Sequence, residues 1–153
     1  SYKGRFKPIN PSKYKGDPSK IIYRSLWEAK FFRFIDQHPD IIWRQSEEVS
    51  IPYLSPIDNK MHRYFPDVIL HKKISENDFK TVMIEIKPSA QTRPPDISRK
   101  NKTPSGRVSR RYINEVKTYG INDAKWVAAR RYCDERGWNF EIMTENHLFG
   151  KSK

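Results

Sequence analysis

The stretch Thr81-Val82-Met83-Ile84-Glu85-Ile86-Lys87 decides the fold of this chain, because it is the clearest β-strand in the sequence. β-branched and apolar residues dominate it, and Pro88 ends it because proline cannot donate a hydrogen bond to a sheet. Glu85 interrupts the apolar run where burial of an unpaired carboxylate would be costly. Lys87 follows two residues later, so both side chains project from one face of the strand.

A second acidic residue stands before the neighbouring apolar run. Pro66-Asp67 precedes the short buried strand Val68-Ile69-Leu70, and a predicted loop at residues 75–80 separates that strand from residues 81–87. A hairpin of the two strands would return the carboxylates of Asp67 and Glu85 to the same end of the sheet.

Two carboxylates with an ammonium group nearby suit a hard divalent cation, since Mg²⁺ prefers oxygen ligands. The backbone carbonyl of Ile86 is a candidate third ligand. Lys87 would orient a water molecule or stabilise negative charge on a phosphate. The plainer interpretation is a Glu85–Lys87 pair on the solvated face of an edge strand, worth roughly 0–1 kcal/mol. Asp67 at hairpin spacing favours the metal site.

The segments before this hairpin predict a helix and then a meander of strands. Ser25 is a good N-cap, Glu28 stands at the capping-box spacing, and Pro39 ends the predicted helix at residues 25–37. The strands that we expect next are residues 41–43, 49–54 and 62–65, with a turn at residues 56–60.

After the hairpin, a helical region at residues 109–137 and a last strand at residues 138–144 are predicted. We expect the helix to break near Gly120, with Asn122 capping its second half and Gly137 following its end. A helix crossover favours parallel pairing of the strands that it joins.

The fold class is therefore α/β (or α+β), with a small mixed β-sheet flanked by helices. The length of 153 residues fits one domain, residues 1–153. Two basic, breaker-rich segments belong to it, an N-terminal arm at residues 1–24 and a long flexible loop at residues 89–111. The arm is either a poorly ordered terminus or is packed on the domain through its aromatic residues, which are Tyr2, Phe6, Tyr14 and Tyr23.

The composition of the chain limits the classes of function that are compatible with it. The chain has 30 Lys and Arg against 18 Asp and Glu, a net charge of +12, which points to nucleic acid first and an anionic membrane second. No run approaches the roughly 18 apolar residues of a membrane span, and no secretory signal is visible. The single Cys133 excludes an internal disulfide and is more typical of a buried residue than of a nucleophile. His62 and His71 lack the spacing of a zinc site.

The two basic segments are the expected DNA contacts, because Lys and Arg neutralise phosphates and release counterions. No base-reading motif is visible, so we expect weak sequence preference. The residues expected to contact DNA are Lys3, Arg5, Lys7, Arg93, Arg99, Lys100, Lys102, Arg107, Arg110 and Arg111.

The acidic residues and their neighbours form a pattern that resembles a known sequence motif. Pro66-Asp67 and Glu85-Ile86-Lys87 resemble the PD-(D/E)XK motif of restriction-like nucleases. Phe65-Pro66-Asp67, Ile84 to Pro88 and the segment beginning Asn122-Asp123-Ala124-Lys125-Trp126 resemble the transposon endonuclease TnsA. Nearly the whole chain, including Arg5-Phe6-Lys7-Pro8-Ile9-Asn10-Pro11, is similar to the head completion nucleases of large contractile-tailed bacteriophages.

This resemblance implies a restriction-endonuclease-like fold and an endodeoxyribonuclease that depends on Mg²⁺ (or Mn²⁺). The enzyme would hydrolyse phosphodiester bonds of double-stranded DNA at the packaged end, before the tail joins the head. It would act in the virion and the host cytoplasm, beside other head or portal and neck proteins and away from membranes.

By the same resemblance, Glu28, Asp67 and Glu85 would be metal-binding carboxylates and Lys87 the catalytic lysine. Gln91 would be a further polar residue of the site. The capping-box role of Glu28 competes with a catalytic one, since a capping side chain turns back to its own helix end. Two other functions stay open. One is a non-catalytic DNA-binding or structural head protein on a nuclease-like fold, and the other is a basic RNA-binding protein.

Overall fold

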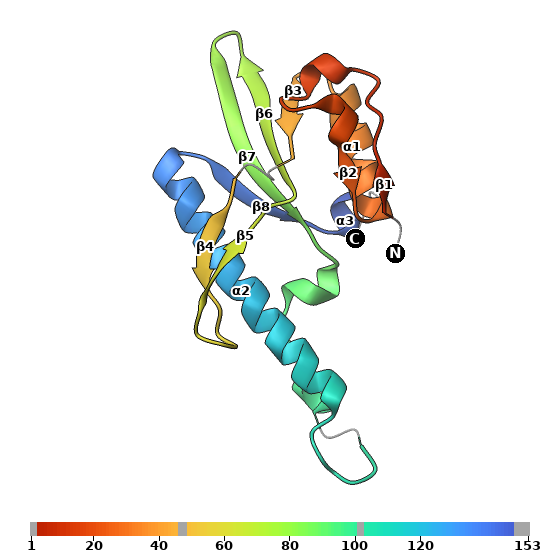
Figure 1. The fold of residues 1–153 in the computed structure, drawn as a ribbon, viewed down its shortest axis with the longest axis vertical. Coiled ribbons are helices and arrows are strands. Elements are labelled where there is room, and N and C mark those ends of the chain that lie inside the picture. Colours follow the sequence, from red (N-terminus) through yellow and green to blue (C-terminus); the bar gives the residue numbers. More distant parts are fainter. Residues whose placement is uncertain (1–2, 46–48, 101–102, 149–153) are drawn as a thin grey trace.

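A four-stranded mixed sheet forms the centre of the computed structural model, which describes residues 3–45, 49–100 and 103–148. The strand order is β3-β6-β7-β8. The strands are β3 (Ile41–Arg44), β6 (Val68–Ser75), β7 (Asp78–Ile86) and β8 (Asn139–Met143). The first three pair antiparallel, whereas β7 and β8 pair parallel across a helical connection (Figure 1). The predicted mixed sheet and parallel crossover are confirmed.

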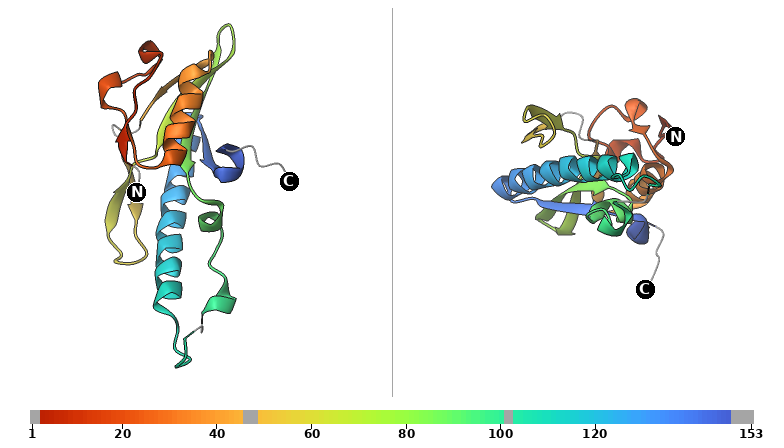
Figure 2. Two further views of the ribbon diagram at one scale, coloured as in Figure 1. Left: turned by 90° about the vertical axis from the view of Figure 1, so that its right-hand side faces the viewer. Right: turned by 90° about the horizontal axis from the view of Figure 1, so that it is seen from below.

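Helices cover both faces of this sheet, α1 (Leu26–Gln37) on one and α2 (Arg110–Arg136) on the other (Figures 1 and 2). Successive side chains of each strand point to opposite faces of the sheet, so they pack on different helices. Val68 of β6 belongs to the buried cluster that contains Phe32 of α1, while the adjacent Ile69 belongs to the cluster that contains Ala129 and Cys133 of α2. The predicted fold class, a small mixed sheet flanked by helices, is therefore confirmed.

The remaining elements lie around this centre. Strands β4 (Ile51–Leu54) and β5 (Met61–Tyr64) form a separate hairpin that packs on α2. In the arm, β1 (Gly4–Arg5) pairs with β2 (Ile22–Tyr23). The short elements are the 3-10 turns η1 (Pro11–Lys13), η2 (Pro18–Lys20), η4 (Ser89–Thr92) and η5 (Ile97–Arg99), and the helix α3 (Glu145–Leu148). None of the described helices has the length and apolar character needed to cross a membrane.

The predicted break near Gly120 is wrong, because α2 is one continuous helix. A glycine inside a helix costs about 1 kcal/mol relative to alanine, and tertiary packing outweighs that cost. Asn122 is buried in the middle of the helix and caps nothing. Ser109 is the N-cap, since its Oγ accepts from the backbone N–H of Tyr112, and Gly137 ends the helix in the left-handed conformation, as predicted.

The predicted loop at residues 75–80 is also mostly strand, because β6 continues to Ser75 and β7 begins at Asp78. The outer half of this hairpin projects beyond the core, and its side chains are exposed from Lys72 to Lys80 (Figure 1). A strand exposed on both faces needs no alternation of apolar and polar residues, so the sequence pattern gives no sign of it.

The N-terminal arm is packed on the domain from residue 3 onward, which decides between the two alternatives; Tyr2 lies outside the described residues. The ring of Phe6 meets those of Phe32 and Trp43 edge-on, and Tyr14 lies 4.7 Å from Trp43 between ring centroids. The Asp36 carboxylate accepts from the backbone N–H groups of residues 9 and 10, at 2.7 and 3.1 Å. Aromatic packing thus attaches the arm to α1 and β3.

Lys13 of the arm caps the end of α1. Its Nζ donates to the carbonyl oxygens of Ile35 and Asp36, each at 2.7 Å, and to that of His38. The last carbonyls of a helix have no partners within the helix, and a cation there also interacts favourably with the helix dipole. Burial lowers the pKa of Lys13, and the nearby charge of Asp36 opposes that shift.

Replacing this lysine tests whether the arm stabilises the domain. We expect Lys13→Met to lower the free energy of unfolding by about 1–3 kcal/mol in urea titrations, because several partly buried carbonyls lose a charged donor. Lys20→Met is the matched control, since Lys20 is 79% exposed in a 3.9 Å ion pair and should change stability by less than about 0.5 kcal/mol. Equal midpoints for the two variants would contradict the capping role.

Candidate active site

The register of the β6–β7 hairpin brings the two predicted carboxylates together. Val68 pairs with Ile84, so Asp67, which comes directly before Val68, lies beside Glu85. The Oδ2 atom of Asp67 accepts a hydrogen bond of 2.8 Å from the backbone N–H of Ile86. Asp67 is thus attached to the end of β7, as the hairpin interpretation of the sequence predicts.

Glu85 is buried on a central strand, with only 5% of its surface exposed. Its Oε1 accepts from the Tyr64 hydroxyl at 2.8 Å, and its Oε2 lies 3.4 Å from the indole nitrogen of Trp126. The Nζ of Lys87 is 3.8 Å from the same Oε2, which confirms that the two side chains share a face. A solvated Glu–Lys pair at a sheet edge does not describe this geometry.

Burial and electrostatic repulsion dominate the titration of Asp67. Burial raises the pKa of Asp67 well above its usual value, and the neighbouring negative charge of Glu85 raises it further. The hydrogen bond from Ile86 opposes these effects without cancelling them. Burial and then the charge of Glu85 likewise raise the pKa of Tyr64, so that the tyrosine keeps its proton and its hydroxyl donates a hydrogen bond to Glu85.

Glu28 lies close to this pair but is engaged at the start of its own helix. The Ser25 Oγ accepts from the Glu28 backbone N–H at 3.1 Å and lies 3.4 Å from the Glu28 carboxylate. Burial raises the pKa of Glu28, and the charge of Glu85 adds the smallest of the contributing effects. The structure therefore shows the Ser25 N-cap with the Glu28 carboxylate beside its hydroxyl, while a role of Glu28 at a metal stays a prediction.

The oxygen atoms of Asp67 and Glu85 suit a hard divalent cation. Among the described residues, no three Asp, Glu, His or Cys side chains are gathered as a complete metal cage would require. Mg²⁺ does not need such a cage, because it usually keeps several waters and binds one or two carboxylates. The partly buried Asp67, whose pKa is raised by desolvation and by the charge of Glu85, lies beside the buried Glu85, and the Lys87 ammonium is 3.8 Å from Glu85, so this pair would gain from such an ion.

Three residues of this site were not predicted from the sequence. Tyr64 and Trp126 hold the two oxygen atoms of Glu85, and the half-buried Lys125 lies near enough for Glu85 and Asp67 to affect its pKa. Tyr64 stands in a predicted strand, and Trp126 belongs to the apolar stripe of α2, so both have the pattern of core residues. Of the three, only Lys125 has an unusual position in the sequence, because it is a lysine directly beside that apolar stripe.

Gln91 lies outside the carboxylate pair, in a neighbouring cleft. The cleft has a volume of about 990 Å³ and separates residues 90–96 from the first turns of α2. Gln91 is exposed there, and its backbone N–H donates to the carbonyl of Pro88. Asn122 also lines the cleft and lies one helical turn from Trp126. The cleft thus begins beside the site, and its lining has three arginines, Arg93, Arg110 and Arg111, against the two acids Asp96 and Glu115.

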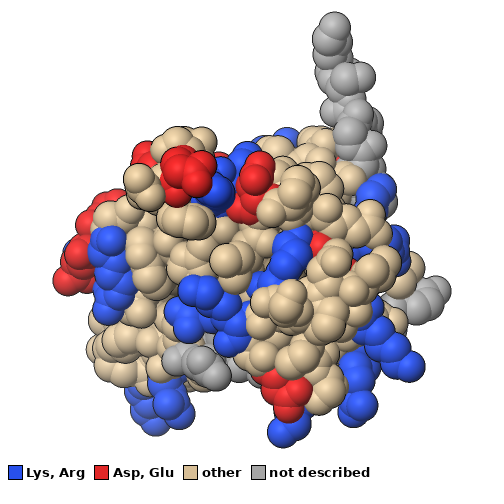
Figure 3. All heavy atoms as spheres, turned by 90° about the horizontal axis from the view of Figure 1, so that it is seen from above, with Lys and Arg blue, Asp and Glu red and all other residues tan. Residues whose placement is uncertain are grey.

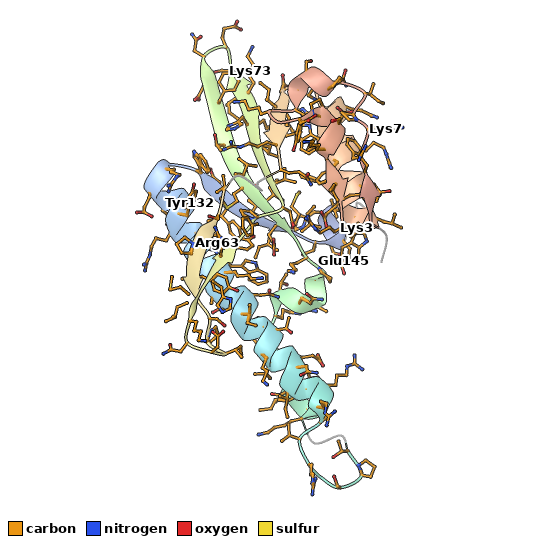
Figure 4. All side chains as sticks on the ribbon, viewed as in Figure 1. Lys3, Lys7, Arg63, Lys73, Tyr132 and Glu145 are labelled. Atoms are coloured by element: carbon orange, nitrogen blue, oxygen red, sulfur yellow. The ribbon has the colours of Figure 1, made fainter. Side chains whose placement is uncertain are left out.

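The predicted DNA contacts lie on two sides of the carboxylate pair. Lys3 and Lys7 are exposed on the arm beside α1, whereas the basic loop lies along α2 at the other end of the molecule (Figure 4). Lys and Arg are spread over the face shown in Figure 3, and Asp and Glu form smaller groups there. The other exposed members are Arg5, Arg93, Lys100, Arg107, Arg110 and Arg111, while Lys102 and the side chain of Arg99 lie outside the described residues.

The other candidate reactive residues have structural surroundings. Cys133 is 1% exposed, and burial raises the pKa of its thiol to about 11, which keeps it protonated. His62 contacts Asp58 at 2.8 Å, and His71 contacts the Thr81 hydroxyl at 2.8 Å. The predicted buried position of Cys133 is confirmed, and each histidine contacts a neighbouring polar side chain.

A mixed sheet between two helices, with acidic residues at the ends of a central hairpin, defines a restriction-endonuclease-like class of nuclease fold. A family model described as "TnsA-like endonuclease N terminal" matches residues 38–145, and the chain belongs to this family. The match includes Asp67, Glu85 and Lys87 and begins after Glu28.

The chain is also similar to a particular protein, the "Head completion nuclease" of Enterobacteria phage T4. The two are 40% identical over 148 residues, which cover 97% of this chain and 94% of that protein. The resemblances to the TnsA endonuclease and to the head completion nucleases are confirmed, and with them the nuclease class of the protein.

Neutralising one carboxylate should stabilise the ion-free protein. The raised pKa of Asp67 means that its stabilising contribution is present at acidic pH and is lost as the pH rises through the folded-state pKa. We therefore expect Asp67→Asn, which can still accept from Ile86, to melt above wild type at pH 7–8 in EDTA, by about 2–4 °C per kcal/mol. The difference should vanish near pH 4. A lower melting temperature for Asp67→Asn at neutral pH would contradict this electrostatic description.

Proposed function

We propose that the protein is a DNA endonuclease that depends on Mg²⁺ (or Mn²⁺) and hydrolyses phosphodiester bonds of double-stranded DNA. The observation that carries this proposal is the pair Asp67 and Glu85, two carboxylates brought together at one end of a hairpin with Lys87 on the same face. Perturbed acidic groups held by dedicated hydrogen bonds are typical of functional sites. The family match and the nuclease relative support the same reaction class.

Asp67, Glu85 and the backbone carbonyl of Ile86 would hold the ion, with Glu28 as a further candidate. A bound ion of this kind neutralises charge on a phosphate and lowers the pKa of water. The protein groups prepare the site for it. The Ile86 N–H fixes Asp67, the hydroxyl of Tyr64 fixes Glu85, and Lys87 would hold a non-bridging oxygen or the attacking water.

DNA would be bound through its phosphates. The exposed basic residues of the arm and the loop lie on two sides of the site, and Gln91 lines the cleft that begins beside it. Contacts of this kind position the duplex without reading its bases. We infer weak sequence preference and a strong decrease of affinity with salt.

The similarity to the T4 protein bears on the stage and the location at which this reaction takes place. We infer that the enzyme trims packaged DNA ends during head completion, in the virion and in the host cytoplasm. Other head, portal or neck proteins would then be its neighbours. A structural head protein that binds DNA without cutting it is the alternative, and the absence of a gathered three-residue metal cluster among the described residues is the observation in its favour.

Removing one charge from the site should stop cleavage without unfolding the protein. Glu85→Gln keeps an acceptor for Tyr64 but loses the anionic ligand. We expect its Mg²⁺-dependent plasmid cleavage to fall by more than about 100-fold, since even outer-shell partners of metal ligands are worth 10–100-fold. Circular dichroism should show an unchanged fold.

Glu141→Gln is the matched control, because Glu141 is exposed on the neighbouring strand β8 and should cut like wild type. Undiminished cleavage by folded Glu85→Gln would contradict the assigned chemistry. No cleavage by wild type with either Mg²⁺ or Mn²⁺ would favour the structural alternative.

A further inference from the structure

Lys125 lies near the carboxylate pair, with its ammonium group against aromatic rings. It comes from α2 and is half-buried, next to Trp126, which contacts Glu85. Its Nζ lies 5.9 Å from the ring centroid of Tyr53 and 5.9 Å from that of Tyr64. Both tyrosines are buried in the β4–β5 hairpin, so α2 and this hairpin together direct the ammonium group towards the site.

The charged groups that influence Lys125 are those of the site. Burial lowers the pKa of Lys125, and the positive charge of Lys87 lowers it further, while Glu85 and Asp67 act in the opposite direction. Over the part of the chain that the structure describes, no carboxylate lies within ion-pair distance of its Nζ. Two lysines thus share the surroundings of two carboxylates, and only Lys87 is within 4 Å of either.

We propose that Lys125 is a second phosphate-binding cation of the active site, which contacts a non-bridging oxygen of the DNA strand that is cut. The inference rests on the proposed nuclease function. A phosphodiester and its transition state carry negative charge that a single divalent ion does not fully balance, and positioned ammonium groups stabilise such charge. An ammonium group held against aromatic faces, without a carboxylate partner, keeps its donors available for an incoming anion.

The positions of the two lysines give them different tasks. Lys87 comes directly after β7 and forms a 3.8 Å ion pair with Glu85 of that strand. Lys125 belongs to α2, the helix that also lines the cleft with Asn122 and the basic residues Arg110 and Arg111. A phosphate at Lys125 would therefore connect the site with the cleft, and the bound strand would continue along α2.

Two measurements test this role. The first is the rate of single-turnover cleavage at saturating duplex DNA with Mg²⁺, where we expect Lys125→Met to be slower by about 10–100-fold, the range for a hydrogen bond to a charged group. The second is the affinity for a fluorescent duplex in EDTA at several salt concentrations. Loss of one phosphate contact should reduce the slope of log K against log salt by about 1.

Lys125→Arg and Lys73→Met are the comparisons. Lys125→Arg restores the positive charge and should recover part of the rate. Lys73 is exposed near the tip of the β6–β7 hairpin, far from the site, so Lys73→Met should cleave saturating DNA at the wild-type rate (Figure 4).

Wild-type rate and salt slope in Lys125→Met would overturn the proposal. Equal losses in Lys125→Met and Lys125→Arg, together with a lowered melting temperature, would also overturn it in favour of a packing role. If wild type cuts no DNA, the nuclease function fails, and the salt slope in EDTA still decides whether Lys125 binds phosphate. If wild type does not bind duplex DNA at all, both proposals fail.

Discussion

Asp67 and Glu85 lie side by side at the end of the β6–β7 hairpin, where ionisation of both would set two poorly screened negative charges against each other. The register of the hairpin makes their contact unavoidable, since Val68 is paired with Ile84 in the centre of the sheet. A slip of one residue would turn the apolar side chains of both strands away from the helices that cover them. The two hydrophobic clusters therefore keep the carboxylates together against their repulsion.

The groups that orient this pair come from separate parts of the chain. The Ile86 backbone holds Asp67, while Tyr64 of β5 and Trp126 of α2 contact Glu85. Formation of the site consequently depends on the packing of α2 and the β4–β5 hairpin on the sheet. The surplus of positive charge is placed outside this acidic centre, on the arm and the basic loop. This division would let one chain attract a polyanion and also provide oxygen ligands for a cation, as the proposed function requires.

Local patterns predicted the central hairpin, the parallel strand after the helix and the positions of Asp67, Glu85 and Lys87. They failed where contacts between residues far apart in the sequence determine the structure. Gly120 suggests a break, but packing keeps α2 continuous, and the outer part of the hairpin lacks alternation because both of its faces are exposed. Tyr64 and Trp126 have the pattern of core residues, and only the folded chain shows that their polar atoms meet Glu85. The sequence does not distinguish the two roles of Glu28, because a capping box and a catalytic site use the same residue type.

Direct binding of the ion is the central claim, and isothermal titration calorimetry of Mg²⁺ or Mn²⁺ into the DNA-free protein tests it most directly. The ion should bind to wild type, and binding should disappear in Asp67→Ala and Glu85→Ala variants that circular dichroism shows to be folded. Release of protons should accompany binding near neutral pH, because the raised pKa of Asp67 favours a protonated ion-free site. No binding to wild type, or equal binding to all three proteins, would contradict the account.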